Sequence, residues 1–363
     1  MQKKLAFIKK KPNQLKLLLE KYPDKDWNTI ALAHNANIDT DIIQSNNTVF
    51  QHNYLIKPIY SNPNFTLDDI KPDNADWNNL SYNPNITWEF ILKYKDEAWD
   101  WNVLSEHPNI TMDIVQNNPE YTISYSQYWN LFYLSSNPNL TWEYVKNNLE
   151  EDQWQWYSIS KHKNITWEII QDNCSVSWDW SAISQNPNIT WEIIKNNPDY
   201  TISDSQVWDW DMISRNPNIT VDIIKNNGSA SWSWYYLSYN PNITWDFILE
   251  YKDKAWSWNI LSDHPNITMD IIEKYNTFNW NWDAMSENPN LTCEFVEKHI
   301  DKEWNWTYMS NNKFLYDDVV YEREYEKYMM QYKSEFRDIF TDLNYSICNK
   351  DISKKIEDFI DCV

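Results

Sequence analysis

Glycine is almost missing from this chain of 363 residues, and the only one is Gly228. β-Propellers, β-solenoids and β-sandwiches need many tight turns, and glycine supplies most of them because it adopts positive φ without steric cost. Loops that hold nucleotide phosphates need several glycines within a short segment. The composition therefore argues against β repeats and excludes Gly-rich phosphate-binding loops.

Positive charge is also scarce. The chain has 31 Lys and Arg against 53 Asp and Glu, a net charge of −22, and only three arginines. Phosphate recognition depends on clusters of Lys and Arg, so we expect no nucleic-acid partner and no anionic membrane surface as a partner. No apolar stretch reaches the length of a membrane span, and the first residues lack the apolar run of a signal peptide. These features predict an intracellular protein that does not bind membranes.

The chemistry of an active site is missing as well. Four scattered cysteines show no metal-ligand spacing and read as free thiols in a reducing compartment: Cys174, Cys293, Cys348 and Cys362. No nucleophile–base arrangement or pair of catalytic carboxylates stands out. We therefore expect no enzyme activity, no catalytic residue, no cofactor and no metal.

A tandem repeat dominates the sequence. The unit reads W-[DNS]-W-x-x-[LIM]-S-x-[NH]-P-N-[IL]-T-[WMV]-[DE]-[FI]-[IV], and its clear copies follow one another at steps of 24, 25 or 30 residues. Two degenerate copies, with Ala33 and Tyr60 at the Ser position, precede ten clear ones, which makes about twelve units between residues 23 and 320. The Ser position is occupied by Ser81, Ser105, Ser135, Ser160, Ser184, Ser214, Ser238, Ser262, Ser286 and Ser310.

Each unit is predicted to form two short helices. Asp100, between Trp99 and Trp101, is a typical N-cap of a first helix, and Thr87 is a typical N-cap of a second helix. The Asn-Pro-Asn segment ends the first helix, because proline disfavours helical geometry at the residue before it. Asn pairs such as Asn117-Asn118 close the second helix, and we expect Asn there to take the left-handed position that glycine usually takes.

Helices of about two turns are not stable alone, so stacking between units must stabilise them. The fold class predicted is all-α: an α-solenoid (superhelix) of about twelve two-helix repeats with helical caps. We predict an N-terminal helical cap over residues 1–22, the repeat solenoid over 23–320, and a C-terminal helical cap or tail over 321–363. The handedness of the superhelix stays open.

Three kinds of residue have both a functional and a structural interpretation. The 24 tryptophans all fall on three repeat positions, which favours core packing over stacking on sugars or bases. His107, His162 and His264 replace the Asn before Pro, which favours a capping role over a metal ladder. An acidic residue in the first turn of each second helix, from Glu89 to Glu294, favours helix-dipole capping over a site for a cation or a basic partner.

The binding surface is predicted from the positions that vary between units. The residue after Ser and the two residues after the second Trp differ from copy to copy, which is typical of exposed positions on a regular scaffold. Tyr and Arg are common at binding hot spots. The candidates are Tyr82, Tyr157, Arg215, Tyr235, Tyr236, Tyr239 and Tyr308.

The string N-P-N-I-T-W-E-I-I, with W-D-W or W-N-W nearby, resembles the Asn- and Trp-rich repeat proteins encoded in multiple copies by giant DNA viruses of amoebae. The resemblance covers about residues 60–310 and implies a viral protein, without implying a biochemical activity. The early units and the tail after residue 320 depart from the motif.

The function predicted is a non-catalytic repeat scaffold that mediates protein–protein interaction, a viral factor that binds a host or viral protein in the host cytoplasm. A structural component packaged in the virion is the first alternative. A glycan-binding module is the second, and it requires solvent-exposed Trp rings.

Overall fold

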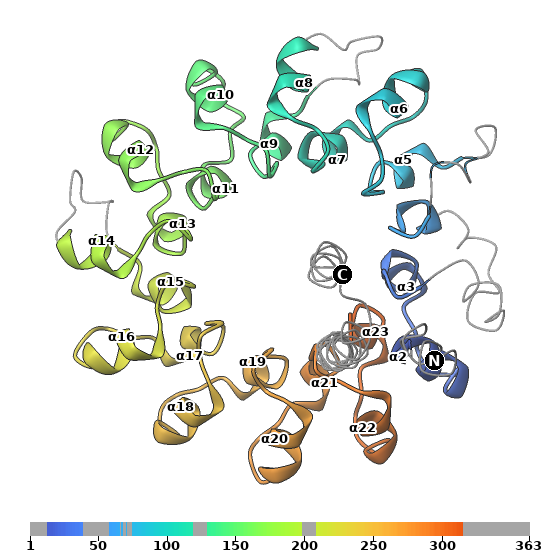
Figure 1. Cartoon of the computed structure of the whole chain (residues 1–363), viewed down its shortest axis with the longest axis vertical. Coiled ribbons are helices and arrows are strands. Elements are labelled where there is room, and N and C mark those ends of the chain that lie inside the picture. Colours follow the sequence, from blue (N-terminus) through green and yellow to red (C-terminus); the bar gives the residue numbers. More distant parts are fainter. Residues whose placement is uncertain are drawn as a thin grey trace, which may run out of the picture. The chain divides into compact units, whose positions relative to one another are not determined.

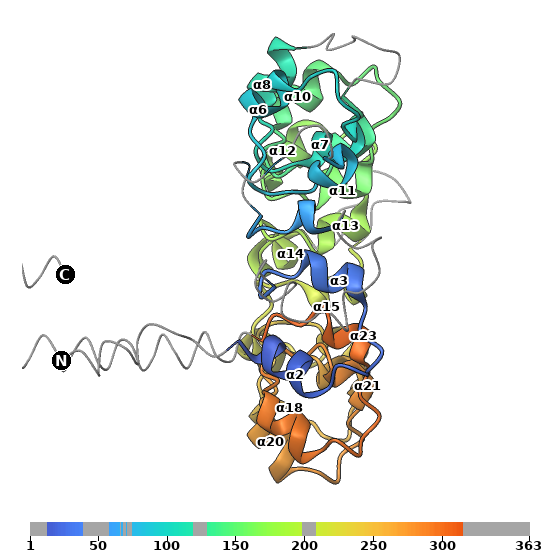
Figure 2. The same ribbon diagram turned by 90° about the vertical axis from the view of Figure 1, so that its right-hand side faces the viewer.

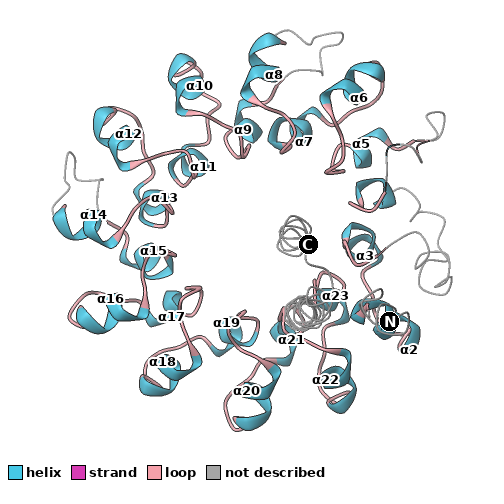
Figure 3. Cartoon of the chain, in the orientation of Figure 1, coloured by secondary structure: helices cyan, strands magenta, loops and turns pink. Residues whose placement is uncertain are grey.

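The computed structural model describes residues 13–38, 58–65, 67, 70, 75–118, 129–197 and 208–314. The chain divides into two compact units, Gln14–Lys313 and a second unit made of Met1–Asn13 with Phe314–Val363. The described residues contain helices and loops and no strand, as the secondary-structure colouring in Figure 3 shows. The predicted all-α repeat solenoid is thus confirmed, and the C-terminal cap or tail predicted over 321–363 lies outside the described residues.

Where both halves of a repeat unit are described, the unit consists of two short helices. The first helices lie on the inner side of the array in Figure 1, and we call them the inner helices. They are α3 (Thr29–His34), the 3-10 helix η2 (Pro58–Ser61), α5 (Trp77–Leu80), α7 (Trp101–Glu106), α9 (Leu131–Leu134), α11 (Trp156–Ser160), α13 (Trp180–Ser184), α15 (Trp210–Arg215), α17 (Trp234–Leu237), α19 (Trp258–Ser262), α21 (Trp282–Met285) and α23 (Trp306–Met309).

The second helices lie on the outer side of the array, and we call them the outer helices (Figure 1). They are α2 (Gln14–Lys21), α6 (Trp88–Lys93), α8 (Met112–Asn117), α10 (Trp142–Asn147), α12 (Trp167–Asp172), α14 (Trp191–Asn196), α16 (Val221–Asn226), α18 (Trp245–Glu250), α20 (Met269–Lys274) and α22 (Cys293–Lys298).

The predicted N-caps are confirmed. The Asp100 carboxylate accepts hydrogen bonds from the backbone N–H groups of Asn102 and Val103 at the start of α7. The Thr87 hydroxyl accepts one from Phe90 N–H at the start of α6. These side chains satisfy backbone donors that a helix leaves unpaired in its first turn.

The expected left-handed Asn at the end of the outer helices is wrong. Among the described residues only Phe314 has a positive φ. Asn118 keeps φ at −132°, and its side-chain Nδ2 donates to the Ile114 carbonyl at 2.8 Å. Asn148 does the same to the Tyr144 carbonyl. The Asn side chain thus donates a hydrogen bond to a carbonyl at the C-terminal end of the helix. Glycine has no side chain, so in its place a backbone N–H would have to donate to that carbonyl.

Tryptophan rings join consecutive units, as expected for core packing. The second Trp of one unit packs edge to face against the first Trp of the next. Trp258 and Trp280 have ring centroids 5.3 Å apart at 89°, and Trp180 and Trp208 are 5.3 Å apart at 79°. This geometry places the positive edge of one ring on the negative face of the other.

Two polar side chains in the repeat also link the backbones of consecutive units by hydrogen bonds. The Ser81 hydroxyl donates to the Trp77 carbonyl of its own helix and accepts from Asp100 N–H of the next unit at 2.9 Å. The Asn before Pro is buried, and its Nδ2 reaches back to carbonyls of the preceding unit. In Asn240 these are the carbonyls of Ser214, Asn216 and Ile219. A buried Asn that donates to the backbone of its neighbour fixes the register of the stack, because a shift would leave buried polar groups unpaired.

The first described unit packs on the last one through the same contacts. Asn28 N–H donates to the Ser310 hydroxyl at 3.0 Å. Asn35 Nδ2 donates to the carbonyls of Ser310 and Asn312. The rings of Trp27 and Trp306 are 5.0 Å apart at 72°. Within residues 14–313 the repeats therefore form a closed circuit rather than a superhelix with two free ends.

Both ends of the circuit contribute to its closing unit. The helix expected within the N-terminal cap is α2, and it holds the outer position beside α23, as Figures 1 and 2 both show. Its Gln14 side chain accepts from Cys293 N–H at 2.8 Å, and Lys21 forms an ion pair with Glu297 of α22. The ring of Tyr22 packs on Trp306 at 5.4 Å. Helix α2 thus takes the place that an outer helix takes in the other units.

Candidate functional site

Five of the seven candidate binding residues lie at the first or fifth position after the second Trp, on one exposed face of the inner helices, whereas Tyr236 and Tyr308 hold the second position. Successive residues of a helix are about 100° apart, so the first and fifth residues after the second Trp lie on one side. The third residue lies opposite and is fully buried, as Leu80 and Ile213 illustrate. Because this buried side faces the core shared with the outer helices, we infer that the exposed face looks toward the inside of the circuit.

The exposed aromatic residues are concentrated on this face. Every exposed large aromatic side chain among the described residues belongs to an inner helix or lies within two residues of its end. They are Tyr82, Phe132, Tyr157, Tyr235, Tyr239 and Tyr308. Tyr236 is half-buried, and Arg215 is exposed. Phe132 was missed by the sequence reasoning, although it occupies the same repeat position as Tyr157 and Tyr235.

Four of the predicted residues come together in one cluster. The guanidinium of Arg215, at the end of α15, lies 4.7 Å from the ring centroid of Tyr239. The ring of Tyr235 is 6.3 Å from that of Tyr239, and Tyr236 is 6.4 Å from it. Burial and the neighbouring Tyr235 raise the pKa of Tyr239, so its hydroxyl is protonated at neutral pH. We call Arg215, Tyr235, Tyr236 and Tyr239 the tyrosine cluster.

The other three candidates lie in separate units. The Tyr157 hydroxyl accepts a hydrogen bond from Gln185 Nε2 at 2.8 Å, and Lys161 lies over its ring at 4.7 Å. Tyr82 is 52% exposed, and its pKa is raised by burial and by the carboxylates of Asp100 and Glu106. Tyr308 is 41% exposed. The structure therefore places Tyr82 and Tyr157 along the same face, and it does not join the three tyrosines into one site.

Carboxylates crowd on the same face. Burial and the nearby Glu287 raise the pKa of Asp263 to about 6. The pKa of Glu287 is raised by burial and by Asp283, and that of Glu106 by burial and by Asp100. Each carboxylate is thus held near another negative group, so a positive charge placed on this face relieves repulsion.

The residues with two interpretations take structural roles in the described part of the chain. All 24 tryptophans are described, and none is exposed. His107 is buried; its Nε2 donates to the Asn83 carbonyl at 3.0 Å, and its Nδ1 accepts from Asn109 N–H. This pairing requires the neutral ring, and burial lowers the pKa of His107 accordingly. His162 and His264 make the equivalent bonds.

The acidic ladder lies on the surface of the outer helices. Its members, such as Glu89 and Asp113, occupy the first helical turn and are exposed. The pKa of Glu168 is lowered by hydrogen bonds from its own backbone N–H and from Thr166. Across the described residues, no three His, Cys, Asp or Glu side chains are grouped so that they would hold a metal ion.

No family model matches the chain, and neither the curated proteins nor the solved structures contain a match. The resemblance to viral Asn- and Trp-rich repeat proteins therefore stays a prediction. None of the helices in the described part of the chain combines the length and the apolar character that a bilayer crossing requires.

Proposed function

We propose that the chain is a non-catalytic scaffold that binds a protein partner along the exposed face of its inner helices. The observation that supports this most is the concentration of exposed tyrosines on that face while all tryptophans are buried or half-buried. Tyr and Arg supply large contact area at binding hot spots, and the tyrosine cluster presents both types together. The remaining surface of each unit repeats, so the variable tyrosines distinguish one part of the circuit from another.

The partner surface is positively charged. The crowded carboxylates at Asp263, Glu287 and Glu106 favour Lys or Arg in the partner, because cations lower the pKa values that burial and mutual repulsion have raised. The chain's net charge of −22 also favours encounter with a basic protein at low salt. Since every tryptophan is buried or half-buried, the scaffold is favoured over the glycan-binding alternative, which requires exposed rings.

Affinity capture from the native context tests the proposal. The tagged chain is expected to retain a stoichiometric basic protein, and the Y235A/Y239A variant is expected to lose at least ten-fold in affinity, as hot-spot tyrosines cost about 1–3 kcal/mol each. The matched control is L92A, which removes an exposed side chain from the outer helix α6. Equal capture by Y235A/Y239A and L92A would overturn the proposed surface.

We further propose that the chain is a viral factor of the host cytoplasm, with packaging in the virion as the alternative. This proposal depends on the sequence resemblance alone. Mass spectrometry of purified particles separates the two locations: stoichiometric recovery from particles supports packaging, and absence from particles supports action in the cell.

A further inference from the structure

Among the ten clear copies of the repeat, one breaks the tryptophan pattern that joins the others. Nine units carry Trp at the second position, and its ring meets the first Trp of the next unit at centroid distances from 5.0 Å, in Trp27–Trp306, to 5.6 Å, in Trp156–Trp178. In the unit of α9 this position holds Leu131. The next first Trp, Trp154, meets Tyr144 instead, at 6.1 Å.

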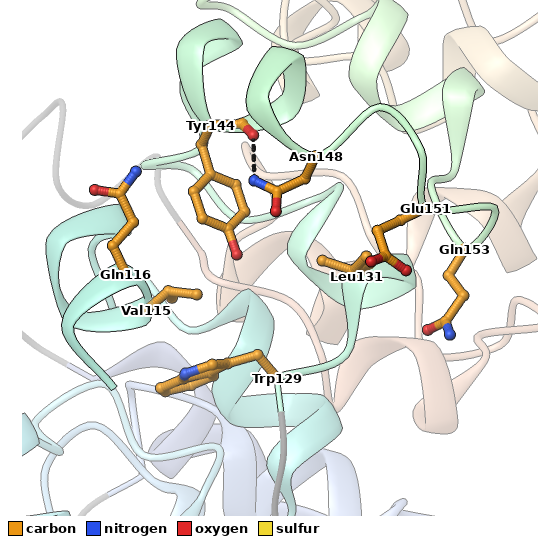
Figure 4. Close-up of a pocket in the computed structure, with 8 residues that line it drawn as sticks. All are labelled: Val115, Gln116, Trp129, Leu131, Tyr144, Asn148, Glu151 and Gln153. Carbon is orange, nitrogen blue, oxygen red and sulfur yellow. Dashed lines mark hydrogen bonds between the residues drawn. The ribbon is translucent and has the colours of Figure 1, made fainter. Parts of the chain in front are cut away.

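A pocket lies where the missing ring would be. Its volume is about 440 Å³, and it is lined by Val115, Gln116, Trp129, Leu131, Tyr144, Asn148, Glu151 and Gln153. Figure 4 shows Val115, Trp129 and the ring of Tyr144 on one side of the pocket, with Gln116 next to Val115, and Leu131 beside Glu151 toward the other side, with Gln153 beyond. The two aromatic rings therefore lie on one side, and the carboxylate lies across from them next to Leu131. We call this cavity the Leu131 pocket.

A second pocket, at the same place between the units of α19–α20 and α21–α22, serves as a comparison. It is lined by Ile272, Trp280 and Trp282, which match Val115, Trp129 and Leu131 in the repeat, and also by Glu273, Asn276, Phe278, His299 and Lys302. Its volume is about 310 Å³. The larger volume accompanies the smaller side chain, as expected when a ring is replaced by Leu.

In three units that carry the second Trp, a lysine covers its ring. Each lysine comes from the loop that follows the adjoining outer helix. Lys302 Nζ lies 5.6 Å from the ring centroid of Trp282, and Lys254 lies 5.3 Å from that of Trp234. Lys25 lies 5.5 Å from the ring centroid of Trp306. A cation over an indole face is attracted by the ring quadrupole. In these units the chain itself supplies both the ring and the cation.

The corresponding loop beside the Leu131 pocket has the opposite charge. It reads Glu150-Glu151-Asp152, and Glu151 lines the pocket. The Glu151 carboxylate lies close enough to add to the effect of burial in raising the pKa of Tyr144. The unit therefore lacks the second ring and its covering lysine, and offers a negative charge beside the apolar space.

We propose that the Leu131 pocket binds an aromatic ring that carries a positive charge beside it. An indole- or phenol-sized ring takes the place of the missing Trp, between Trp129, Leu131 and Tyr144. The attached ammonium or guanidinium lies beside Glu151. The ligand is either a free aromatic amine or an aromatic side chain next to Lys or Arg in a polypeptide. This site is separate from the inner-helix face, so its failure would leave the proposed function untouched.

Calorimetric titration of the full chain with two matched probes tests the charge requirement. Tryptamine carries an indole and an ammonium, whereas indole-3-propionate carries the same ring and a carboxylate. We expect tryptamine to bind with one site per chain and indole-3-propionate to bind at least ten-fold more weakly. A Lys-Trp-Lys peptide tests the second source: tighter binding than tryptamine indicates a polypeptide, and weaker binding indicates a free amine. No heat from tryptamine at millimolar concentration would overturn the proposal.

Two variants locate the binding in this pocket. L131W fills the space with the side chain that the other units carry, and we expect it to abolish tryptamine binding and raise the melting temperature. E151Q changes an exposed residue without changing its size, so folding is retained. It is expected to weaken tryptamine binding several-fold and leave neutral indole binding unchanged. Unaltered tryptamine binding in E151Q would contradict the role of the carboxylate, whether or not L131W folds.

Discussion

The junction that closes the circuit can be compared with the internal junction between the units of α21 and α23. In the internal junction, Trp282 and Trp304 are 5.2 Å apart, and Asn305 N–H donates to the Ser286 hydroxyl at 2.9 Å. In the closing junction, the corresponding distances are 5.0 Å for Trp27–Trp306 and 3.0 Å for Asn28–Ser310. The two junctions differ in how the chain connects their units. At the internal junction, α22 and its loop join the two units directly. At the closing junction, residues near the two ends of the segment Gln14–Lys313 meet.

Side-chain contacts, and not the continuity of the chain, therefore set the geometry between consecutive units. In an open repeat array each unit contacts only its sequence neighbours, and stability is the sum of local terms. Here the contacts of the closing junction contribute one further such term, although the residues that form them are far apart in the sequence. Its formation requires closure of a long loop, which slows folding more than it lowers stability.

Removal of the ring at each junction should give the largest effects. W306A and W282A each delete a packed indole, and a Trp→Ala change in a core costs about 3–5 kcal/mol. W282A should lower the melting temperature while the circuit stays closed, because the chain still joins the two units. W306A should open the circuit, which small-angle scattering would report as a larger radius of gyration. Equal radii for the two variants would contradict a special role of the closing junction.

Removal of the buried Asn is expected to have the next largest effect. N288A takes away bonds to the carbonyls of Ser262 and Ile267, and N35A takes away those to Ser310 and Asn312. Buried acceptors left unpaired cost about 1–3 kcal/mol. Urea denaturation should show comparable losses in the two variants, with faster hydrogen exchange in α2 and α3 for N35A. The control is N196A, an exposed position on α14, which should change stability little.

The smallest effect is a pH dependence of the three internal junctions in which His replaces the buried Asn. His107, His162 and His264 have pKa values lowered by burial, so the unfolded chain binds more protons than the folded one below about pH 6.5. Their contribution is present at neutral pH and is lost as the pH falls through that range. The closing junction uses Asn35, which does not titrate.

The triple variant H107N/H162N/H264N isolates this contribution. The stability of the unmodified chain should fall more steeply between pH 7 and pH 5 than that of the variant, as followed by urea denaturation at each pH. Asp263 acts in the opposite direction, because its pKa of about 6 lets protonation stabilise the folded chain as the pH falls. Since Asp263 is present in both proteins, the difference between them reports the histidines. Parallel pH profiles would show that folding leaves the pKa values of these histidines unchanged.

Much of the local structure could be predicted from single residues. Asp100 and Thr87 cap helices as predicted, because a cap depends on residues within one turn. The interpretation of the histidines as structural also agrees with the bonds of His107. The left-handed Asn was wrong because the side chain of Asn118 offers the carbonyl a donor, which the analogy with glycine ignored.

The candidate surface was predicted less completely. Variation between units pointed to Tyr235, Tyr239 and Arg215, and the structure brings these three together. Phe132 and the crowding of Asp263 with Glu287 were missed. Crowding depends on the distances between carboxylates of neighbouring units. A comparison of the repeat sequences does not contain those distances. The Leu131 pocket was missed for the same reason, although the departure from Trp was visible in the repeat.

The sequence by itself determined the number of units, their two-helix form and the burial of the tryptophans, because these follow from local caps and from a strict repeat register. Only the packing of the whole chain makes the repeats close on themselves, lets α2 complete the unit of α23, and leaves a larger pocket beside Leu131 than beside Trp282. Closure is the sum of small rotations between twelve units, and no single residue encodes that sum. Each junction is specified locally, but only their combined geometry brings Trp27 against Trp306.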